Sequence, residues 1–162
     1  MTNATIDRLK QALKLIAADR HKLVLLLGDF GSGKTRVLKQ LAAEMSGEYI
    51  ALNLALTERL LARPRRDYAD GVTAHGLIDA LCDECSPDKR LLCVDNVEVL
   101  FSPELGKLNP VDTFKRIARE RPVVLALPVR RQGGMAVYSA GGRADYMQIP
   151  LEDYGVVEIG EA

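Results

Sequence analysis

The eight residues at positions 28–35 have the types and spacing of a phosphate-binding loop. They match the pattern G-x-x-x-x-G-K-[ST] in full and read Gly28, Asp29, Phe30, Gly31, Ser32, Gly33, Lys34 and Thr35. Glycines let the backbone curl so that amide N–H groups face inward, and a following helix adds the positive end of its dipole. Lys34 can reach the β- and γ-phosphates, and the Thr35 hydroxyl is a hard oxygen ligand for Mg²⁺. The loop therefore predicts a site for a nucleoside triphosphate with magnesium.

A second acidic position completes this type of site. Asp95 ends the apolar run Leu91-Leu92-Cys93-Val94, which is the Walker B pattern. We expect this run to be a buried strand next to the strand that precedes the loop. Asp95 would then hold magnesium, mainly through water, between the β- and γ-phosphates. The alternative role for Asp95 is a helix cap at the end of the strand.

The residues that would support hydrolysis are less clearly marked. Many ATPases of this layout carry a glutamate directly after the Walker B aspartate, and this chain has Asn96 there. An amide can orient water but cannot act as a general base. Glu98 is the nearest candidate base and Glu58 a weaker one, although each could equally be a solvated carboxylate. We therefore expect slow turnover, with Lys34, Asp95, Asn96 and Glu98 as the candidate catalytic residues.

The identity of the nucleotide follows by elimination. The sequence contains no N-K-x-D motif, and Asp95 is not the first residue of a D-x-x-G motif. Both motifs are typical of small GTPases, so ATP is the favoured nucleotide. No residue in the sequence identifies the contacts to the base.

Strands and helices alternate along the chain. Apolar residues at helical spacing predict a first helix with Ile6, Leu9, Leu13 and Ile16 on its inner face. A helix with Val37, Leu38, Leu41 and Met45 on its apolar face follows the loop, and Ser46-Gly47 stops it. Further helices are expected around Leu56, Leu60 and Leu61, after Thr73 with Leu77, Ile78 and Leu81 inside, and from Asn109-Pro110. We expect strands at 23–27, 49–54, 91–94, 123–127 and 156–159.

This alternation predicts one α/β domain over residues 1–162, of the P-loop NTPase class. Its five-stranded sheet is expected to be mainly parallel, with helices on both faces and ligands at the carboxyl ends of the strands. No helical lid is expected after the last strand. Residues 128–142 are rich in glycine, arginine and small side chains, so we expect a long loop, with a short strand at 135–138 as an option.

Composition excludes several classes of protein. Lysine plus arginine and aspartate plus glutamate number 22 each, so no net positive field draws the chain to DNA or to an anionic membrane, although a local basic patch remains open. No apolar run approaches the roughly 20 residues of a membrane span, and we expect a cytoplasmic protein. Cys82 and Cys85 form a CxxC that lacks a second ligand pair for zinc, which favours the end of a buried helix.

The residues after the Walker B strand carry a resemblance to a known family. The block from Leu91 to Leu105, the stretch from Leu108 to Asp112, and the segment from Phe114 to the strand at 123–127 resemble BrxF, the family of small P-loop proteins of BREX phage-defence systems. The resemblance spans nearly the whole chain. It implies a component of a prokaryotic defence complex that works beside a DNA methyltransferase and larger ATPases. It also implies that Gly28 to Thr35 form the nucleotide loop and that Asp95 is the metal acid.

Three functions remain open from the sequence. The first is an ATP-binding, slowly hydrolysing component of such a complex. The second is a small-molecule or nucleotide kinase, in which arginines grip a phosphorylated acceptor; the candidates are Arg63, Arg65, Arg66, Arg130 and Arg131. The third is a nucleotide-dependent switch without turnover, which Asn96 favours. We also expect a homo-oligomer or assembly with other defence proteins, in which Arg130, Arg131 or Arg143 reaches a neighbour's nucleotide; solubility is the alternative role of these arginines.

Overall fold

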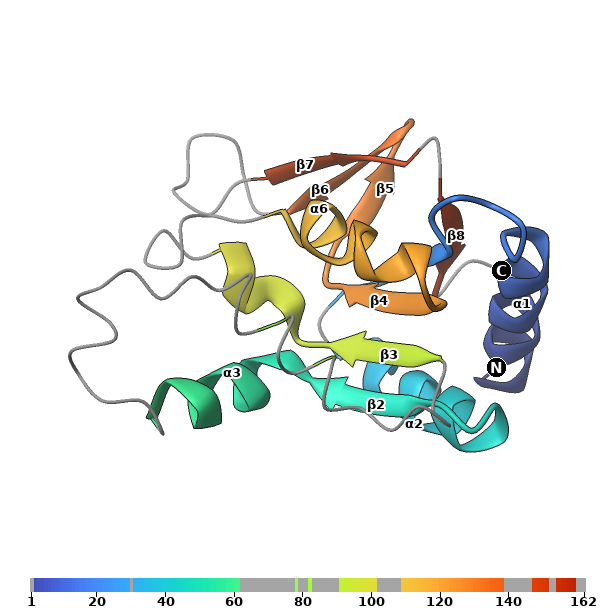
Figure 1. Ribbon diagram of the computed structural model, residues 1–162. Coiled ribbons are helices and arrows are strands. Elements are labelled where there is room, and N and C mark those ends of the chain that lie inside the picture. Colours follow the sequence, from blue (N-terminus) through green and yellow to red (C-terminus); the bar gives the residue numbers. More distant parts are fainter. Residues whose placement is uncertain are drawn as a thin grey trace.

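A parallel sheet forms the centre of the protein (Figure 1). The computed structural model describes residues 2–29, 31–61, 78, 82, 91–101, 109–138, 147–151 and 154–159. Within them, the sheet contains β1 (Leu23–Leu27), β2 (Glu48–Ala51), β3 (Leu92–Asp95), β4 (Val123–Leu127) and β8 (Gly155–Glu158). The strand order is β2-β3-β4-β1-β8, and every neighbouring pair is parallel. This confirms the predicted α/β fold and its five-stranded sheet.

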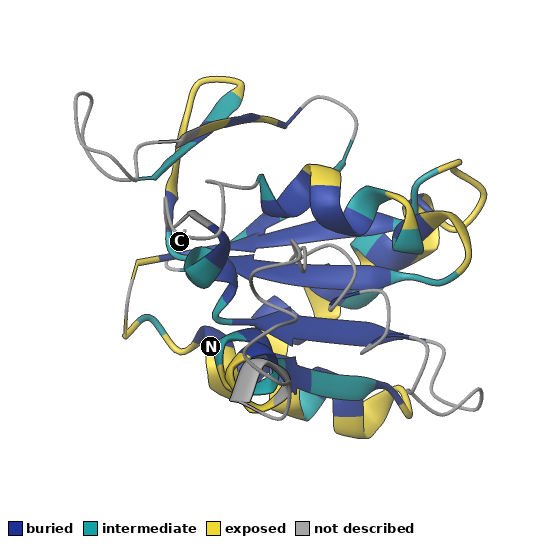
Figure 2. Ribbon diagram, turned by 60° about the vertical axis from the view of Figure 1, so that its left-hand side comes forward, coloured by how far each residue is buried: buried dark blue, intermediate teal, exposed yellow. Residues whose placement is uncertain are grey.

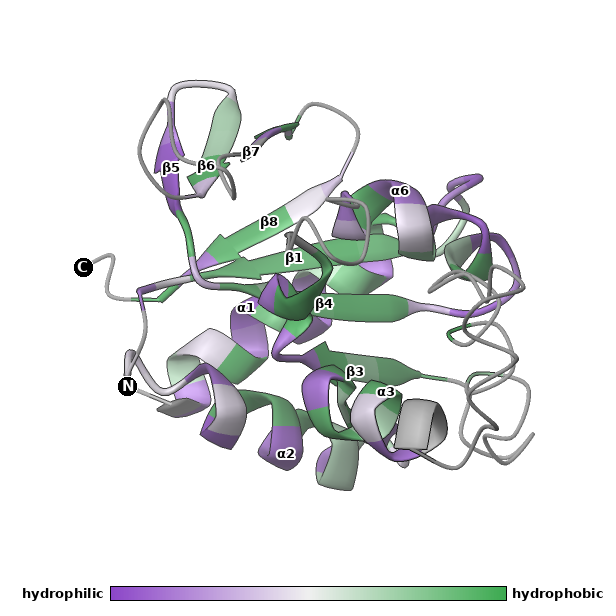
Figure 3. Cartoon of the chain, turned by 90° about the vertical axis from the view of Figure 1, so that its left-hand side faces the viewer, coloured by the Kyte–Doolittle hydropathy of each residue, from purple (hydrophilic) through white to green (hydrophobic). Residues whose placement is uncertain are grey.

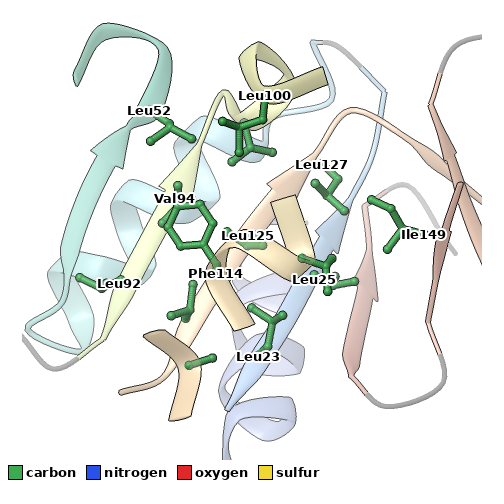
Figure 4. Packing of buried hydrophobic residues seen from close by; sticks show 14 of the residues in the cluster. Leu23, Leu25, Leu52, Leu92, Val94, Leu100, Phe114, Leu125, Leu127 and Ile149 are labelled. Atoms are coloured by element: carbon green, nitrogen blue, oxygen red, sulfur yellow. The ribbon is translucent and has the colours of Figure 1, made fainter. Parts of the chain in front are cut away.

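Helices cover both faces of this sheet, and each face has its own hydrophobic core. Helices α1 (Thr2–Leu15) and α2 (Lys34–Glu44) pack on one face, against side chains such as Val24, Cys93 and Val124. The other face carries α3 (Leu52–Leu61), the 3₁₀ helices η1 (Val97–Phe101) and η3 (Ile117–Arg119), and α6 (Pro110–Lys115). Figure 4 shows this second core, with Phe114 among the strand leucines.

Burial on both faces explains why the central strands are continuous apolar runs. All five residues of β1 and of β4 are buried, as are the four of β3 (Figure 2). The edge strand β2 is only partly buried. In the described part of the chain, no helix combines the length and the apolar character that a membrane span requires.

The ends of the elements differ from the sequence-based expectation in a few places. The second strand ends at Ala51 instead of Leu54, because α3 starts at Leu52 and buries Leu52 and Leu56 while Leu54 is exposed. The Asn109 cap is confirmed, since its side chain accepts hydrogen bonds from the backbone of Val111 and Asp112. The helix expected after Thr73 lies outside the described residues, except for the buried, helical positions 78 and 82.

A second, small sheet replaces the long loop expected after β4. It contains β5 (Arg130–Gln132), β6 (Met135–Tyr138) and β7 (Met147–Pro150), all antiparallel. The option of a strand at 135–138 is confirmed, but the loop prediction is wrong. Gly133 and Gly134 form the two-residue turn between paired Gln132 and Met135, and Gly133 has a φ of 63°. The glycines that indicated a loop therefore make a hairpin, whose first strand is hydrophilic (Figure 3).

Candidate nucleotide-binding site

The glycine-rich loop joins β1 to α2 at the carboxyl end of the central sheet. Gly31 and Gly33 have φ values of 78° and 97°, in the left-handed region where a side chain is strained. A Cβ on Gly28 would lie 2.6 Å from Ser32 Oγ, so this glycine permits a close approach. Phe30 lies outside the described residues. Gly31 and Gly33 thus give the loop a backbone path that other residues would resist.

Lys34, the first residue of α2, is held by oxygens of the loop itself. Its Nζ donates hydrogen bonds to the carbonyls of Gly28 at 2.7 Å and Asp29 at 2.6 Å, and to Ser32 Oγ at 3.3 Å. Burial lowers the pKa of Lys34, while the negative charges of Asp95, Glu98 and Asp29 raise it. The ammonium therefore has a fixed place inside the loop. Phosphate oxygens are acceptors of the same kind and carry more negative charge.

Thr35 and Asp95 are brought into direct contact. Thr35 Oγ1 donates to Asp95 Oδ2 at 2.5 Å, and Asp95 is 4% exposed. The expectation that the Walker B strand lies next to β1 is wrong, because β4 lies between them. The contact forms nevertheless, since α2 packs over both β3 and β4 and carries Thr35 towards the end of β3.

Tyr49 is a member of this network that sequence reasoning missed. Its hydroxyl donates to Asp95 Oδ2 at 2.8 Å, and burial together with this hydrogen bond raises the pKa of Tyr49 to about 12. Tyr49 pairs in register with Cys93, which lies two residues before Asp95 and therefore on the same face of the sheet. Only the register of β2 against β3 reveals this proximity, and no local pattern encodes that register.

The candidates for hydrolysis occupy different places. Asn96 and Glu98 both line the cleft at the loop, whereas Glu58 lies on the exposed surface of α3 and is not among the lining residues. Burial raises the pKa of Glu98, and the charge of Asp95 raises it further. Asn96 has a φ of 57°, a left-handed conformation that asparagine tolerates better than most residues. Asparagine at 96 therefore has a backbone role that the sequence did not reveal.

Arg130 from β5 pairs with the loop of its own chain. Its Nε donates to Asp29 Oδ2 at 2.8 Å and its Nη2 contacts the same oxygen, and this guanidinium lowers the pKa of Asp29. Both side chains are more than half exposed. Arg131 is also exposed and donates to the carbonyl of Gly133, whereas Arg143 lies outside the described residues. The second sheet thus contributes a cation to the rim of the loop.

These residues surround a cleft of about 1580 Å³, which is large enough for a nucleotide. Thr35 and Asp95 supply the hard oxygen atoms that magnesium prefers, and Asp95 is a charged side chain kept almost wholly from water. No three His, Cys, Asp or Glu side chains group to hold a metal among the residues that can be placed. A few protein oxygens joined by phosphate oxygens are the usual surroundings of Mg²⁺, so the residues present fit this ion.

The fold and the loop define a P-loop domain of the ATPase type. The chain belongs to the AAA ATPase domain family, whose profile matches residues 3–127. No curated protein sequence matches it significantly.

The chain is also similar to solved structures. The chain is similar to the Walker-type ATPase PABY2304 of Pyrococcus abyssi, with a TM-score of 0.51 and 14% identity over 96% of this chain and 52% of that one. It is also similar to the replication initiator DnaA bound to AMPPCP and single-stranded DNA, with a TM-score of 0.49 and 18% identity over 96% and 45% of the two chains. The chain spans about half the length of these structures.

Proposed function

We propose that this domain binds ATP with magnesium in the cleft and hydrolyses it slowly. The observation that carries the proposal is the 2.5 Å hydrogen bond between Thr35 and Asp95, which joins the ends of two motifs 60 residues apart. In this account the loop amides and Lys34 bind the phosphates, while Thr35 and Asp95 hold the ion. Magnesium, when bound, neutralises charge on the phosphate oxygens.

The proposal assigns proton transfer to Glu98. This carboxylate lines the cleft and has a raised pKa, so it can take a proton from water more readily than an ordinary glutamate. Asn96, at the same rim, can orient that water but cannot accept the proton. Glu58 is set aside as a base because it does not line the cleft. Many ATPases have the base directly after the metal acid, whereas Glu98 lies three residues after Asp95. Slow turnover agrees with this difference.

Incubation with ATP labelled at the γ-phosphate tests this proposal against its alternatives. The account expects labelled free phosphate, at a rate that falls at least tenfold in Glu98→Gln and stays near wild type in the matched variant Glu58→Gln. Label on an added acceptor would instead indicate a kinase. Of its candidate arginines, Arg130 and Arg131 lie on β5, and the other three, Arg63, Arg65 and Arg66, lie outside the described residues. Tight binding without released or transferred label would indicate a nucleotide-dependent switch.

We further propose that the domain serves a BREX-like phage-defence complex. The support is the sequence block from Leu91 to Leu105 with the Asn109-Pro110 helix start, together with an ATPase-type fold. The test is the genomic neighbourhood and the proteins that purify with the tagged chain. A DNA methyltransferase and a large ATPase in both sets would agree with this role. Their absence from both would count against the defence role and leave the ATPase proposal standing.

Assembly is the remaining part of the proposal. The cleft is open at its rim, and Arg131 on β5 is exposed, so a neighbouring subunit or a larger ATPase could approach nucleotide there. An arginine supplied across an interface commonly raises such rates by about 10³ to 10⁵. Sedimentation with and without a non-hydrolysable ATP analogue should show association that nucleotide strengthens. A monomer under every condition, with Arg130→Ala, Arg131→Ala and Arg143→Ala all fully active, would contradict this part.

A further inference from the structure

The Asp95 carboxylate accepts three hydrogen bonds from three different parts of the chain. Thr35 Oγ1 and the Tyr49 hydroxyl both donate to Oδ2, at 2.5 and 2.8 Å. The backbone N–H of Asn96 donates to Oδ1 at 2.9 Å. Donors to both oxygens therefore fix the orientation of the carboxylate about the Cβ–Cγ bond of Asp95. Of these donors, Tyr49 is the one that lies outside the two nucleotide-binding motifs.

The Tyr49 hydroxyl is itself held in place by packing of its ring. Tyr49 packs against the core between the sheet and α2, and the Lys39 ammonium lies 5.2 Å from the ring centroid. This distance is within the range of a cation–π contact. Tyr49 does not line the cleft, so it can affect nucleotide only through residues that do, chiefly Asp95, which accepts its hydrogen bond. A side chain placed this way acts on the carboxylate and not on the ligand.

We propose that Tyr49 is a positioning residue for magnesium, acting by holding the Asp95 carboxylate in one orientation. This inference rests on the proposed function of the site. Groups that hydrogen-bond a metal ligand fix its direction, and their loss commonly lowers metal affinity by about 10- to 100-fold. The Thr35 hydroxyl can donate its hydrogen to the carboxylate while a lone pair binds the ion, whereas the Tyr49 hydroxyl is a second donor to Oδ2 that is assigned to the carboxylate alone. Thr35 thus holds Oδ2 from α2, and Tyr49 holds the same oxygen from β2.

The variant Tyr49→Phe tests the inference, since it removes the hydroxyl and keeps the ring. ATP binding is measured across a magnesium titration and again in EDTA. The account expects apparent magnesium affinity to fall roughly tenfold, as for other lost partners of metal ligands, with binding in EDTA unchanged. Tyr154→Phe, at another half-buried tyrosine that packs against the opposite core, is the matched control and should behave as wild type. Equal affinity in Tyr49→Phe and wild type would overturn the inference.

A double-mutant cycle with Asp95→Asn shows whether the effect passes through the carboxylate. Tyr49→Phe should change magnesium affinity no further in that background, and an undiminished effect there would contradict the inference. The chain has five tyrosines and no tryptophan, so tyrosine absorption gives a second readout. Magnesium added to nucleotide-bound wild type should perturb that absorption, and the change should be lost in Tyr49→Phe and kept in Tyr154→Phe. A change that persists in Tyr49→Phe would count against Tyr49.

The wild-type titration separates this inference from the proposed function. A wild type that binds no ATP, or binds it equally in magnesium and EDTA, would contradict the proposed site itself. If wild type needs magnesium to bind ATP tightly and Tyr49→Phe has the same apparent magnesium affinity, only the role of Tyr49 is contradicted.

Discussion

The central parallel sheet and the small antiparallel sheet contribute to the candidate site in different ways. The central sheet is buried on both faces and places Asp95 at the end of β3, where it meets Thr35 in near exclusion from water. The small sheet begins with β5, whose three residues are all exposed, and it offers Arg130 to Asp29 at the surface of the loop. The loop therefore has a buried half and an exposed half.

This difference separates two kinds of polar contact. A buried donor or acceptor that loses its partner carries its full desolvation cost, so the Thr35–Asp95 pair should be sensitive to substitution. An exposed ion pair is screened by water and salt, so the Asp29–Arg130 pair should be tolerant. Substitutions in the two regions, taken from the largest expected effect to the smallest, test this contrast.

Leu125→Ala in β4 should destabilise the fold most. Leu125 is fully buried in the core shown in Figure 4, and leucine-to-alanine changes at such sites cost about 2–5 kcal/mol of unfolding free energy. Val137→Ala, at a half-buried position of β6, is the comparison and should cost roughly 1 kcal/mol. Urea denaturation followed by circular dichroism measures both. Similar losses would show that the small sheet is as important to stability as the central one.

Asp95→Ala should weaken ATP binding in magnesium by roughly tenfold or more, because hydrogen bonds and contacts to a charged group contribute about 1.5–3 kcal/mol. Binding in EDTA should change much less, since Asp95 is assigned to the ion and not to phosphate. Isothermal titration in the two buffers gives the comparison. Equal losses in both would argue that Asp95 has no role in holding metal.

Asn96→Glu should have a smaller, mixed effect. A glutamate adjacent to Asp95 supplies a carboxylate that can act as a base, so hydrolysis should rise while ATP affinity stays similar. The left-handed φ of Asn96 adds about 1–2 kcal/mol of strain for a glutamate, which should appear as a lower melting temperature. Asn96→Gly is the matched control and should keep wild-type stability. A Glu variant as stable as the Gly variant would show that the backbone does not select asparagine.

Arg130→Ala should have the smallest effect on stability. Its partner Asp29 and the guanidinium are both largely exposed, so loss of the pair should shift the melting temperature no more than Arg131→Ala does. Salt should affect wild type and variant alike. A lower melting temperature in Arg130→Ala alone, with a difference from wild type that shrinks in high salt, would contradict this expectation. It would mean that the exposed half of the loop is held as firmly as the buried half.

Much of the fold follows from the sequence because the central sheet is encoded locally. The apolar runs at 23–27 and 123–127 match β1 and β4 at both ends. The pair Asn109-Pro110 predicts the capped start of α6. Of the small sheet, the sequence indicated only β6, as an option, because β5 and its glycine turn carry polar and small residues that also suit a loop. Tyr49 was missed because its contact depends on pairing between strands more than forty residues apart, which no local pattern determines.

Equilibrium binding of ATP in magnesium to wild type and to Lys34→Ala tests the central claim most directly. Lys34 is held by loop oxygens and not by the apolar core, so the variant should fold with an unchanged circular dichroism spectrum. The account predicts that wild type binds ATP and that Lys34→Ala binds it at least about 100-fold more weakly, because a charged contact to phosphate is lost. A folded Lys34→Ala protein with wild-type affinity would contradict the assignment of the nucleotide to this loop.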